Sequence, residues 1–319
     1  MRKTIAATAY EDDLRVIARE AATTAFASLA DDLYANFYCR PRESAATSST
    51  RDERMRFLAD LSLANCGTGH WETGWSVAAR EGDTMIVIRS GLRLFAHQND
   101  VRASAELGPA CRGRILVGKE LRALIRGFYS AVGNADGSDD PEVPLVRLYW
   151  NLAASGASRY IALVTSTFND AGIPFWTKVL SDPGGYVRAD AGVLYVERTD
   201  VCAVAPMVHR IYDEIAPFLH DPVPMFTKRL APGLAWAEDP GGARSFGQTR
   251  CQAIARGLRA CIDRSHDLDD RYRSIRESLK AEGIDPNAPH LCGGRDEAYA
   301  SLSFDGAIVQ HERAGDDLS

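Results

Sequence analysis

The sequence predicts a mixed α+β protein, with helices and antiparallel strands in its first half and alternating strands and helices in its second half. Three observations predict this class. Apolar residues recur at helical spacing over residues 11–39. Short apolar runs separated by turn residues fill 70–97. From 146 to 264, runs of strand length alternate with longer amphipathic segments, which favours a mixed sheet.

In the first half, the expected helix over 11–39 ends before Pro41, and residues 43–51 have the composition of a loop. A shorter helix follows at about 52–64. The meander over 70–97 has strands joined by turns at 81–83 and 90–91. A strand near 114–118 then leads into a helix expected over about 119–132.

Residues 133–143 are acidic and rich in turn residues, so they are the best linker candidate. They divide the chain into a helical and β-meander region, 1–135, and an α/β region, 144–319. The two regions can also form one continuous domain.

In the second half we expect strands and helices in alternation. Gly172 is a suitable residue to end the first of these helices. The strand–helix–strand order over 146–180 fits a parallel crossover unit. The expected strands are 146–152, 175–180 and 191–196, the extended segment is 225–236, and the helices are 156–171, 204–219 and 245–264.

Composition and charge exclude several classes of protein. The 319 residues are 45% hydrophobic and 25% charged, which is typical of a globular chain of one or two domains. Every apolar stretch is shorter than the roughly 20 residues of a membrane-spanning helix, and acidic residues at 11–13 interrupt any secretory signal. We therefore expect a cytoplasmic protein. Its net charge of −6 offers no broad positive field for nucleic acid or a membrane.

No cofactor motif is visible. The seven cysteines are scattered without a C-x-x-C pair, so we interpret them as small buried hydrophobic residues and expect no metal site. The sequence contains no G-x-x-x-x-G-K-[ST], H-E-x-x-H or G-x-S-x-G motif, which argues against P-loop ATPases and the common hydrolases. Neither a metal nor an organic cofactor is expected.

Lysine is scarce in this arginine-rich chain, with only five residues, so each lysine marks a place where arginine does not serve. Lys178 lies on an expected strand and shares a face with Trp176 and Leu180. Burial and nearby arginines would lower its pKa toward that of a general base. The alternative is an edge lysine that extends to solvent. Lys228 follows the same aromatic-x-Lys pattern.

Other polar residues suit a phosphate-bearing substrate. Arg147 and Asn151 share one face of an expected strand. Tyr186, Arg188 and Asp190 alternate along the loop between two expected strands, and the alternative is a simple ion pair between Asp190 and Arg188.

A third candidate for phosphate binding is the helix that Ser245 opens. Ser245 and Gln248 form a capping-box pattern after a glycine-rich turn, and Arg250 follows in the first helical turn. A helix N-terminus with an adjacent arginine favours anions. The alternative is an ordinary capped helix with a surface arginine. We interpret His209, His220 and His266, which lie on or beside amphipathic helices, as structural.

Several long motifs resemble the HopA-type family, which is named for type III secreted effectors of plant-pathogenic bacteria. Related proteins occur in actinobacterial gene clusters for class V lanthipeptides and thioamitides. The resemblance covers roughly residues 25–265. This chain differs from the family pattern in having Arg244 where glutamate is usual and Thr249 where histidine is frequent. The motifs that carry the resemblance are 33–41, 119–122, 127–129, 146–152, 174–183, 186–195, 226–228 and 237–251.

The resemblance implies a lyase. A separate kinase similar to aminoglycoside phosphotransferases phosphorylates serine or threonine of a precursor peptide, and the HopA-type protein eliminates the phosphate to leave dehydroalanine or dehydrobutyrine. β-Elimination needs a base for the Cα proton and positive charge for the leaving phosphate. On this reading Lys178 is the base, with Lys228 as the second choice, and Tyr186 or Asp190 donates a proton. The residues expected to bind phosphate or substrate are Arg147, Asn151, Arg188, Ser245 and Arg250.

Two other functions stay open. The chain can be a non-catalytic subunit that binds the leader peptide or activates the kinase. It can also be an effector-like protein that acts on a different phosphoprotein.

Overall fold

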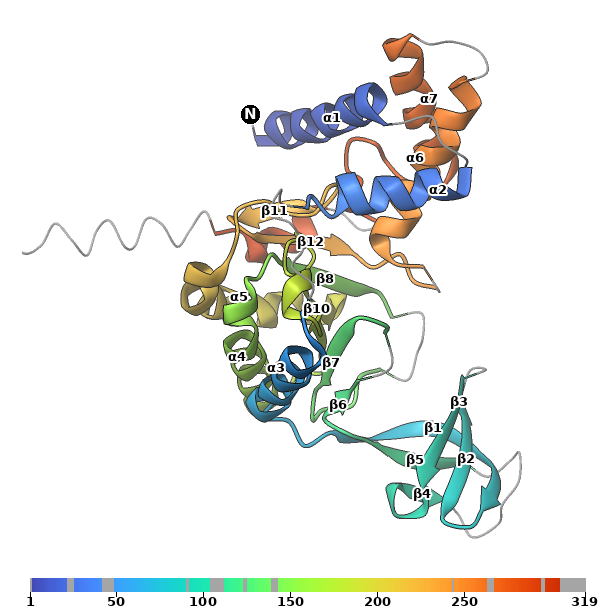
Figure 1. The fold of residues 1–319 in the computed structure, drawn as a ribbon, viewed down its shortest axis with the longest axis vertical. Helices are drawn as coiled ribbons and strands as arrows, with labels where there is room; N and C mark the ends of the chain where they lie inside the picture. The colour runs from blue at the N-terminus through green and yellow to red at the C-terminus, as the bar shows by residue number, and fades with distance from the viewer. Residues whose placement is uncertain are drawn as a thin grey trace, which may run out of the picture.

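The computed structural model describes residues 2–21, 26–41, 49–89, 92–103, 112–122, 125–138, 143–242, 244–262, 267–293 and 296–304. At its centre lies a seven-stranded sheet with strand order β11-β12-β8-β10-β9-β7-β6, in which every neighbouring pair is antiparallel (Figure 1). Its strands are β6 (Glu120–Leu121), β7 (Phe128–Val132), β8 (Leu145–Trp150), β9 (Trp176–Leu180), β10 (Gly192–Glu197), β11 (Lys228–Ala231) and β12 (Leu234–Glu238).

One face of this sheet is covered by α3 (Arg51–Ala64), α4 (Ala157–Asp170) and α5 (Val201–Ile215). Burial of the apolar side chains of α4 and α5 against alternate strand residues forms the largest core. Thr50 and Glu53 form a reciprocal capping box at the start of α3. Gly172, two residues after the end of α4, has a positive φ of 65°, as expected for a glycine that closes a helix.

The opposite face is covered by helices from both ends of the chain. These are α1 (Arg2–Glu20), α2 (Phe26–Asp32), a π-helix (Leu33–Tyr38), α6 (Phe246–Ile262) and α7 (Leu268–Ala281). Their buried residues form a second core with Tyr149, Val193 and Tyr195 of the sheet. The single helix expected over 11–39 is wrong, because the apolar periodicity continues across the break between α1 and α2 and does not reveal it.

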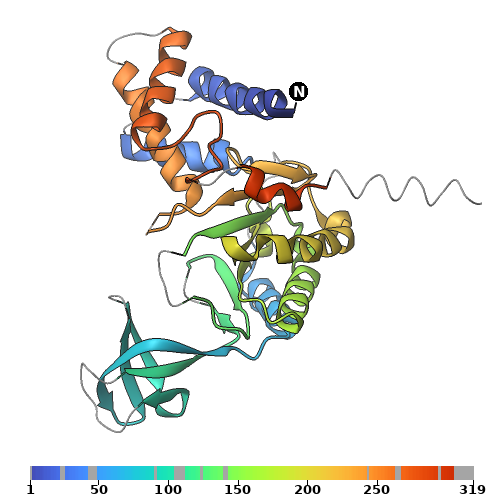
Figure 2. The ribbon, with the colours of Figure 1, turned by 180° about the vertical axis from the view of Figure 1, so that it is seen from behind.

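A second sheet projects from the end of the molecule opposite α1 and α7 (Figure 2). It has the order β3-β2-β1-β5-β4 and its own small core around Trp75, Val77 and Ile115. The antiparallel meander expected over 70–97 is therefore confirmed. The strands are β1 (His70–Glu81), β2 (Thr84–Arg89), β3 (Leu92–His97), β4 (Val101–Ala103) and β5 (Arg112–Val117).

Two expectations about the elements need correction. The helix expected over 119–132 is instead the pair β6 and β7, separated by a turn in which Gly127 has a φ of +83°. The strands β8 and β9 are joined by α4 and run in the same direction, but β10 lies between them and is antiparallel to both. The α+β class is confirmed, although the sheet is antiparallel rather than mixed.

The strands on either side of the expected division near 135–144, β7 and β8, belong to the same seven-stranded sheet. The expected turn at 90–91, most of the loop over 43–51 and part of the linker over 133–143 lie outside the described residues. Among the described helices, none is both long and apolar enough to cross a membrane.

Candidate functional site

Charged and aromatic side chains gather on the sheet face that packs against α6. Directly paired residues of neighbouring strands share a face. Tyr195 of β10 is paired with Arg147 of β8 and with Trp176 of β9. One step along the strands, Val193 is paired with Lys178 of β9. The three central strands therefore bring Arg147, Tyr195 and Lys178 onto one face. We call these three residues, together with Arg188 and Asp190, the Lys178 site.

The Lys178 ammonium is surrounded by aromatic rings. Its Nζ lies 4.6 Å from the ring centroid of Phe128, 5.7 Å from Tyr195 and 6.0 Å from Trp176. Trp176 and Tyr195 stack with their centroids 4.3 Å apart. Within the described part of the chain, no hydrogen bond or ion pair joins Nζ to another residue. The rings shield this cation from water without neutralising it.

Burial, together with the smaller effect of the positive charge of Arg147, lowers the pKa of Lys178 to about 8, whereas Asp190 acts in the opposite direction. A substantial fraction of the lysine is therefore neutral near pH 8. Neutral amine is the form that can take a proton from carbon.

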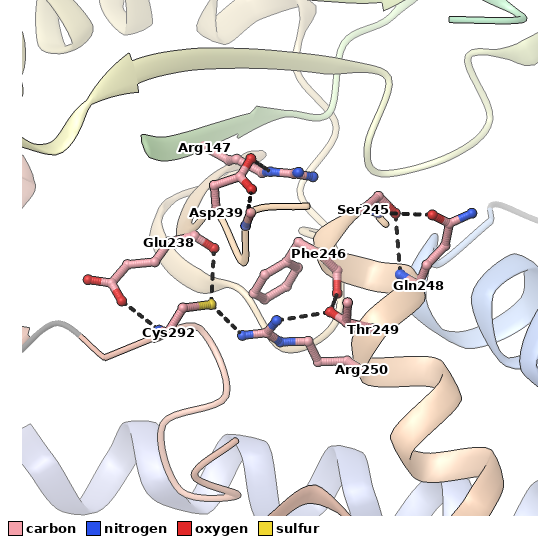
Figure 3. A network of polar contacts seen from close by, with 10 residues as sticks. Arg147, Glu238, Asp239, Ser245, Phe246, Gln248, Thr249, Arg250 and Cys292 are labelled. Atoms are coloured by element: carbon pink, nitrogen blue, oxygen red, sulfur yellow. Dashed lines mark hydrogen bonds and ion pairs between the residues drawn. The ribbon is translucent and has the colours of Figure 1, made fainter. Parts of the chain in front are cut away.

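Arg147 is held in place by a carboxylate. Its Nε donates to Oδ2 of Asp239 at 2.6 Å, and its guanidinium carbon lies 5.1 Å from the Tyr195 ring centroid. Asp239 is itself fixed, because its other oxygen accepts a hydrogen bond from the Gly241 amide at 2.7 Å (Figure 3). Arg147 therefore enters the site in a fixed orientation, with donors that Asp239 does not use.

Arg188 and Asp190 form a bidentate pair on the loop between β9 and β10. Arg188 Nε and Nη2 donate to the two carboxylate oxygens, the second at 2.7 Å. Tyr34 donates to Asp190 and accepts from Arg188, both at 3.2 Å. Asp190 is only 4% exposed, whereas the Arg188 side chain keeps 27% of its surface accessible. The ion pair between Arg188 and Asp190, which the sequence analysis gives as an alternative, is present. Asp190 therefore binds Arg188 and is not an unpaired carboxylate.

Three buried polar atoms lie on this face without a hydrogen-bond partner among the described residues. They are Oγ of Ser130, which is paired with Lys178 across β7 and β9, Nε1 of Trp176, and the hydroxyl oxygen of Tyr149, which is paired with Val193 across β8 and β10. Buried polar groups are nearly always satisfied, so such atoms call for an explanation. A polar ligand bound at the Lys178 site would provide partners.

Three residues singled out by sequence lie away from this site. Lys228 is paired with Trp236, which is paired with Leu148, so it is on the opposite face of the sheet, where its Nζ contacts Asp296 at 2.7 Å. Tyr186 belongs to the core of that other face and donates to the Leu180 carbonyl at 2.8 Å.

Asn151 lies beyond the end of β8 and donates to the Pro222 carbonyl at 2.7 Å. These three contacts are structural, and none of them brings the residue to Lys178.

The N-terminus of α6 is capped as the sequence predicts. The Ser245 amide donates to the Gln248 side chain at 2.9 Å, and the Gln248 amide donates to the Ser245 hydroxyl at 3.3 Å (Figure 3). The cap itself therefore satisfies the Gln248 amide at this helix end.

Arg250 is neither a surface residue nor open to a ligand, because it is 1% exposed. It donates to the carbonyls of Pro289 and Leu291, both at 3.1 Å, and to Sγ of Cys292 at 3.0 Å. Its guanidinium stacks 4.0 Å over the Phe246 ring centroid. In this structure Arg250 anchors the segment after α7 to α6, and the phosphate-binding role expected of it finds no open donor.

Sequence reasoning missed three residues of the site. Tyr195 lies two residues after Val193 on a strand that the sequence predicts, so the two-residue period of a strand places both side chains on the same face. Asp239 and Tyr34 carried no signal, because each is far in sequence from the arginine that it contacts.

Comparison with known proteins agrees with this architecture. The sequence model of the HopA1 effector protein family matches residues 121–291, which is more than half of the chain. The solved structure of an effector protein from Pseudomonas syringae pv. tomato strain DC3000 superposes with a TM-score of 0.55 at 18% identity, over 90% of this chain and 98% of that one. An effector protein from Pseudomonas syringae pv. syringae strain 61 gives 0.50 and 16%, over 89% and 98%. A search of curated proteins finds no match.

Proposed function

The chain belongs to the HopA1 effector protein family, and from this membership and the Lys178 site we propose that it is a lyase which eliminates phosphate from phosphoserine or phosphothreonine of a precursor peptide. The observation that carries the proposal is Lys178. It is desolvated, has a pKa lowered to about 8, makes no hydrogen bond or ion pair with any described residue, and shares its sheet face with Arg147.

The proposed chemistry uses these side chains in separate roles. Neutral Lys178 takes the Cα proton of the phosphorylated residue, the electron pair of that bond forms the Cα–Cβ double bond, and the Cβ–O bond breaks to release phosphate. Arg147 and Arg188 bind the phosphate, since guanidinium groups match its oxygens in bidentate fashion. The products are dehydroalanine from phosphoserine and dehydrobutyrine from phosphothreonine.

Departure of the phosphate is easier when a side chain donates a proton to it, and for this role we propose a residue that the sequence analysis does not select. Tyr195 lies on β10, between the strands of Arg147 and Lys178, and burial raises its pKa, so it is protonated at neutral pH. We assign Tyr195 this role. Asp190 accepts hydrogen bonds from Arg188 and Tyr34, which makes it a positioning residue for Arg188.

The substrate requires a phosphorylating partner. We propose a kinase similar to aminoglycoside phosphotransferases, which supplies the phosphopeptide. Elimination itself consumes no nucleotide, so the lyase step is separable from phosphorylation.

The test is mass spectrometry of a purified phosphothreonine precursor peptide incubated with this protein alone. Loss of one phosphoric acid per modified site, without kinase or ATP, is the expected result. Lys178→Met should abolish the loss. The matched control is Lys119→Met, because Lys119 donates to the backbone carbonyls of Ser62 and Asn65 and does not belong to the Lys178 site.

Two outcomes of this experiment would favour a different function. Binding of the peptide with an unchanged mass, both with and without kinase, would overturn the lyase and favour a leader-binding or kinase-activating subunit. Loss of phosphate from a folded phosphoprotein but not from the precursor peptide would favour an effector-like activity. The fold shared with Pseudomonas syringae effector proteins is the observation that keeps this second candidate in view.

A further inference from the structure

Outside the Lys178 site, three potential metal ligands meet where the small sheet joins the main body. His70 and Glu72 begin β1, and Asp136 lies in the segment after β7. One side-chain donor atom from each lies within 4.8 Å of the others. We propose that His70, Glu72 and Asp136 bind a divalent transition-metal ion such as Zn²⁺.

The spacing of the donor atoms suits a shared ion. His70 Nε2 and Asp136 Oδ1 are 3.6 Å apart, which is longer than a hydrogen bond. Two ligands at about 2.1 Å from a tetrahedral zinc ion are separated by roughly 3.4 Å. A small inward movement of each side chain would therefore complete the coordination, whereas a direct hydrogen bond would need a closer approach.

The surrounding contacts orient these ligands. His70 Nδ1 lies 2.8 Å from the Gly133 carbonyl, an arrangement that places the proton on Nδ1 and leaves the Nε2 lone pair directed at the proposed ion. Metal-binding histidines typically donate their other ring N–H in this way. Trp75 Nε1 donates to Glu72 Oε2 at 2.7 Å, and Arg89 contacts the other oxygen of Glu72.

The site is accessible and has room for water. The three ligands line a cavity of about 350 Å³ whose wall includes Val132 and Phe175. The Asp136 side chain is one-third exposed, so an ion can enter from solvent. A water molecule can supply the fourth ligand.

The donor set indicates the class of metal. One imidazole with two carboxylates and no thiolate suits zinc or manganese, whereas magnesium and calcium prefer oxygen ligands alone. The ligands come from β1 and from the segment after β7, so the ion would tie the small sheet to the seven-stranded sheet. This role does not depend on the proposed lyase activity.

The test is isothermal titration calorimetry with zinc chloride on the full chain, after chelator treatment and under reducing conditions. Wild-type protein should bind one equivalent that His70→Ala and Asp136→Asn lose. The matched control is His97→Ala, because His97 lies at the exposed end of β3 in the same sheet. Exposed thiols such as Cys66 can also bind zinc, so the readout is the difference between proteins.

A thermal shift provides a second measurement. Zinc should raise the melting temperature of the wild type and His97→Ala but not that of His70→Ala, because a ligand that binds only the folded state stabilises it. Asp136→Asn keeps the shape of the side chain and serves if His70→Ala does not fold. Equal zinc uptake by wild type and both ligand variants would overturn the proposal, as would absence of uptake by the wild type.

Discussion

Replacement of Lys178 by methionine should stabilise the protein while it abolishes elimination. Methionine keeps the length and apolar character of the lysine stem but removes the ammonium group. The ammonium lies among Phe128, Trp176 and Tyr195, and no described carboxylate forms an ion pair with it. The folded state therefore holds a desolvated charge that the variant no longer carries.

The size of the stabilisation follows from the pKa. Burial lowers the pKa of Lys178 from the ordinary 10.5 to about 8. At about 1.4 kcal/mol per pKa unit, protonated Lys178 costs the folded state roughly 3 kcal/mol. We take this as an upper limit and expect Lys178→Met to add about 2 kcal/mol to the free energy of unfolding at pH 7, because solvent relaxation around the site reduces the cost.

The sign of the pH dependence is fixed by linkage. Between the folded pKa near 8 and the unfolded pKa of 10.5, the unfolded chain binds more protons, so the wild type gains stability as pH rises. Below pH 8 both states are protonated and the cost is complete. The advantage of Lys178→Met should therefore be largest below pH 8 and disappear toward pH 10.5.

The assay is chemical denaturation at pH 7 and pH 9.5, together with phosphopeptide elimination at pH 8. Lys119→Met is the matched control, because its Nζ donates to the carbonyls of Ser62 and Asn65 at 3.0 and 2.9 Å. Loss of these charged hydrogen bonds should lower the stability by about 2 kcal/mol and leave elimination intact.

Two results would refute the reasoning. If Lys178→Met lowers the stability at pH 7, the ammonium has a stabilising partner and is not a tuned base. If elimination survives in Lys178→Met, the base lies elsewhere, whatever the stability shows.

The remaining predictions concern the pH profile and three other basic residues. The kcat/KM for elimination should rise about tenfold per pH unit below 8 and level off above it, since it reports the neutral Lys178 of the free enzyme; a flat profile from pH 6 to 9 would contradict this. Arg147→Ala should lower kcat by about 10²–10³-fold, measured by single-turnover mass spectrometry, because phosphate loses a fixed donor. Lys228→Met should keep elimination within a few-fold and lower the free energy of unfolding by about 1 kcal/mol, because Asp296 loses an ion pair that is one-third exposed; denaturation and the same peptide assay test both effects. Arg250→Met should lower the free energy of unfolding by roughly 3 kcal/mol, since one buried and one partly buried carbonyl lose their donor, and a denaturation midpoint equal to that of the wild type would contradict its anchoring role.

The strands that carry the proposed chemistry could be predicted, but their neighbours in the sheet could not. The two-residue period places Arg147 on one face of β8 and Lys178 on one face of β9. The faces coincide only because β10 pairs with both strands, and that register is fixed by contacts distant in sequence. Tyr195 lies between the two cations for the same reason.

Predictions from local sequence patterns were wrong where a turn or a segment distant in sequence determines the structure. The apolar residues between 119 and 132 fit a helical period as well as a strand period, and the positive φ of Gly127 separates the two strands. Arg250 and Lys228 resembled ligand-binding residues because their actual partners lie about 40 to 70 residues further along the chain. The three proposed metal ligands His70, Glu72 and Asp136 form no sequence motif, because only the fold brings Asp136 close to the other two.

The charge distribution at the Lys178 site sets Lys178 apart from the two arginines. Arg147 is matched by Asp239 and Arg188 by Asp190, so each of these charges is neutralised within the fold. Lys178 has no such counterpart among the described residues, and a methionine or leucine would fill its place at lower cost. Folding alone therefore does not explain a lysine here. In the proposed reaction the phosphate is bound by Arg147 and Arg188, and the lack of a described counter-charge keeps part of Lys178 in the neutral form that acts as the base.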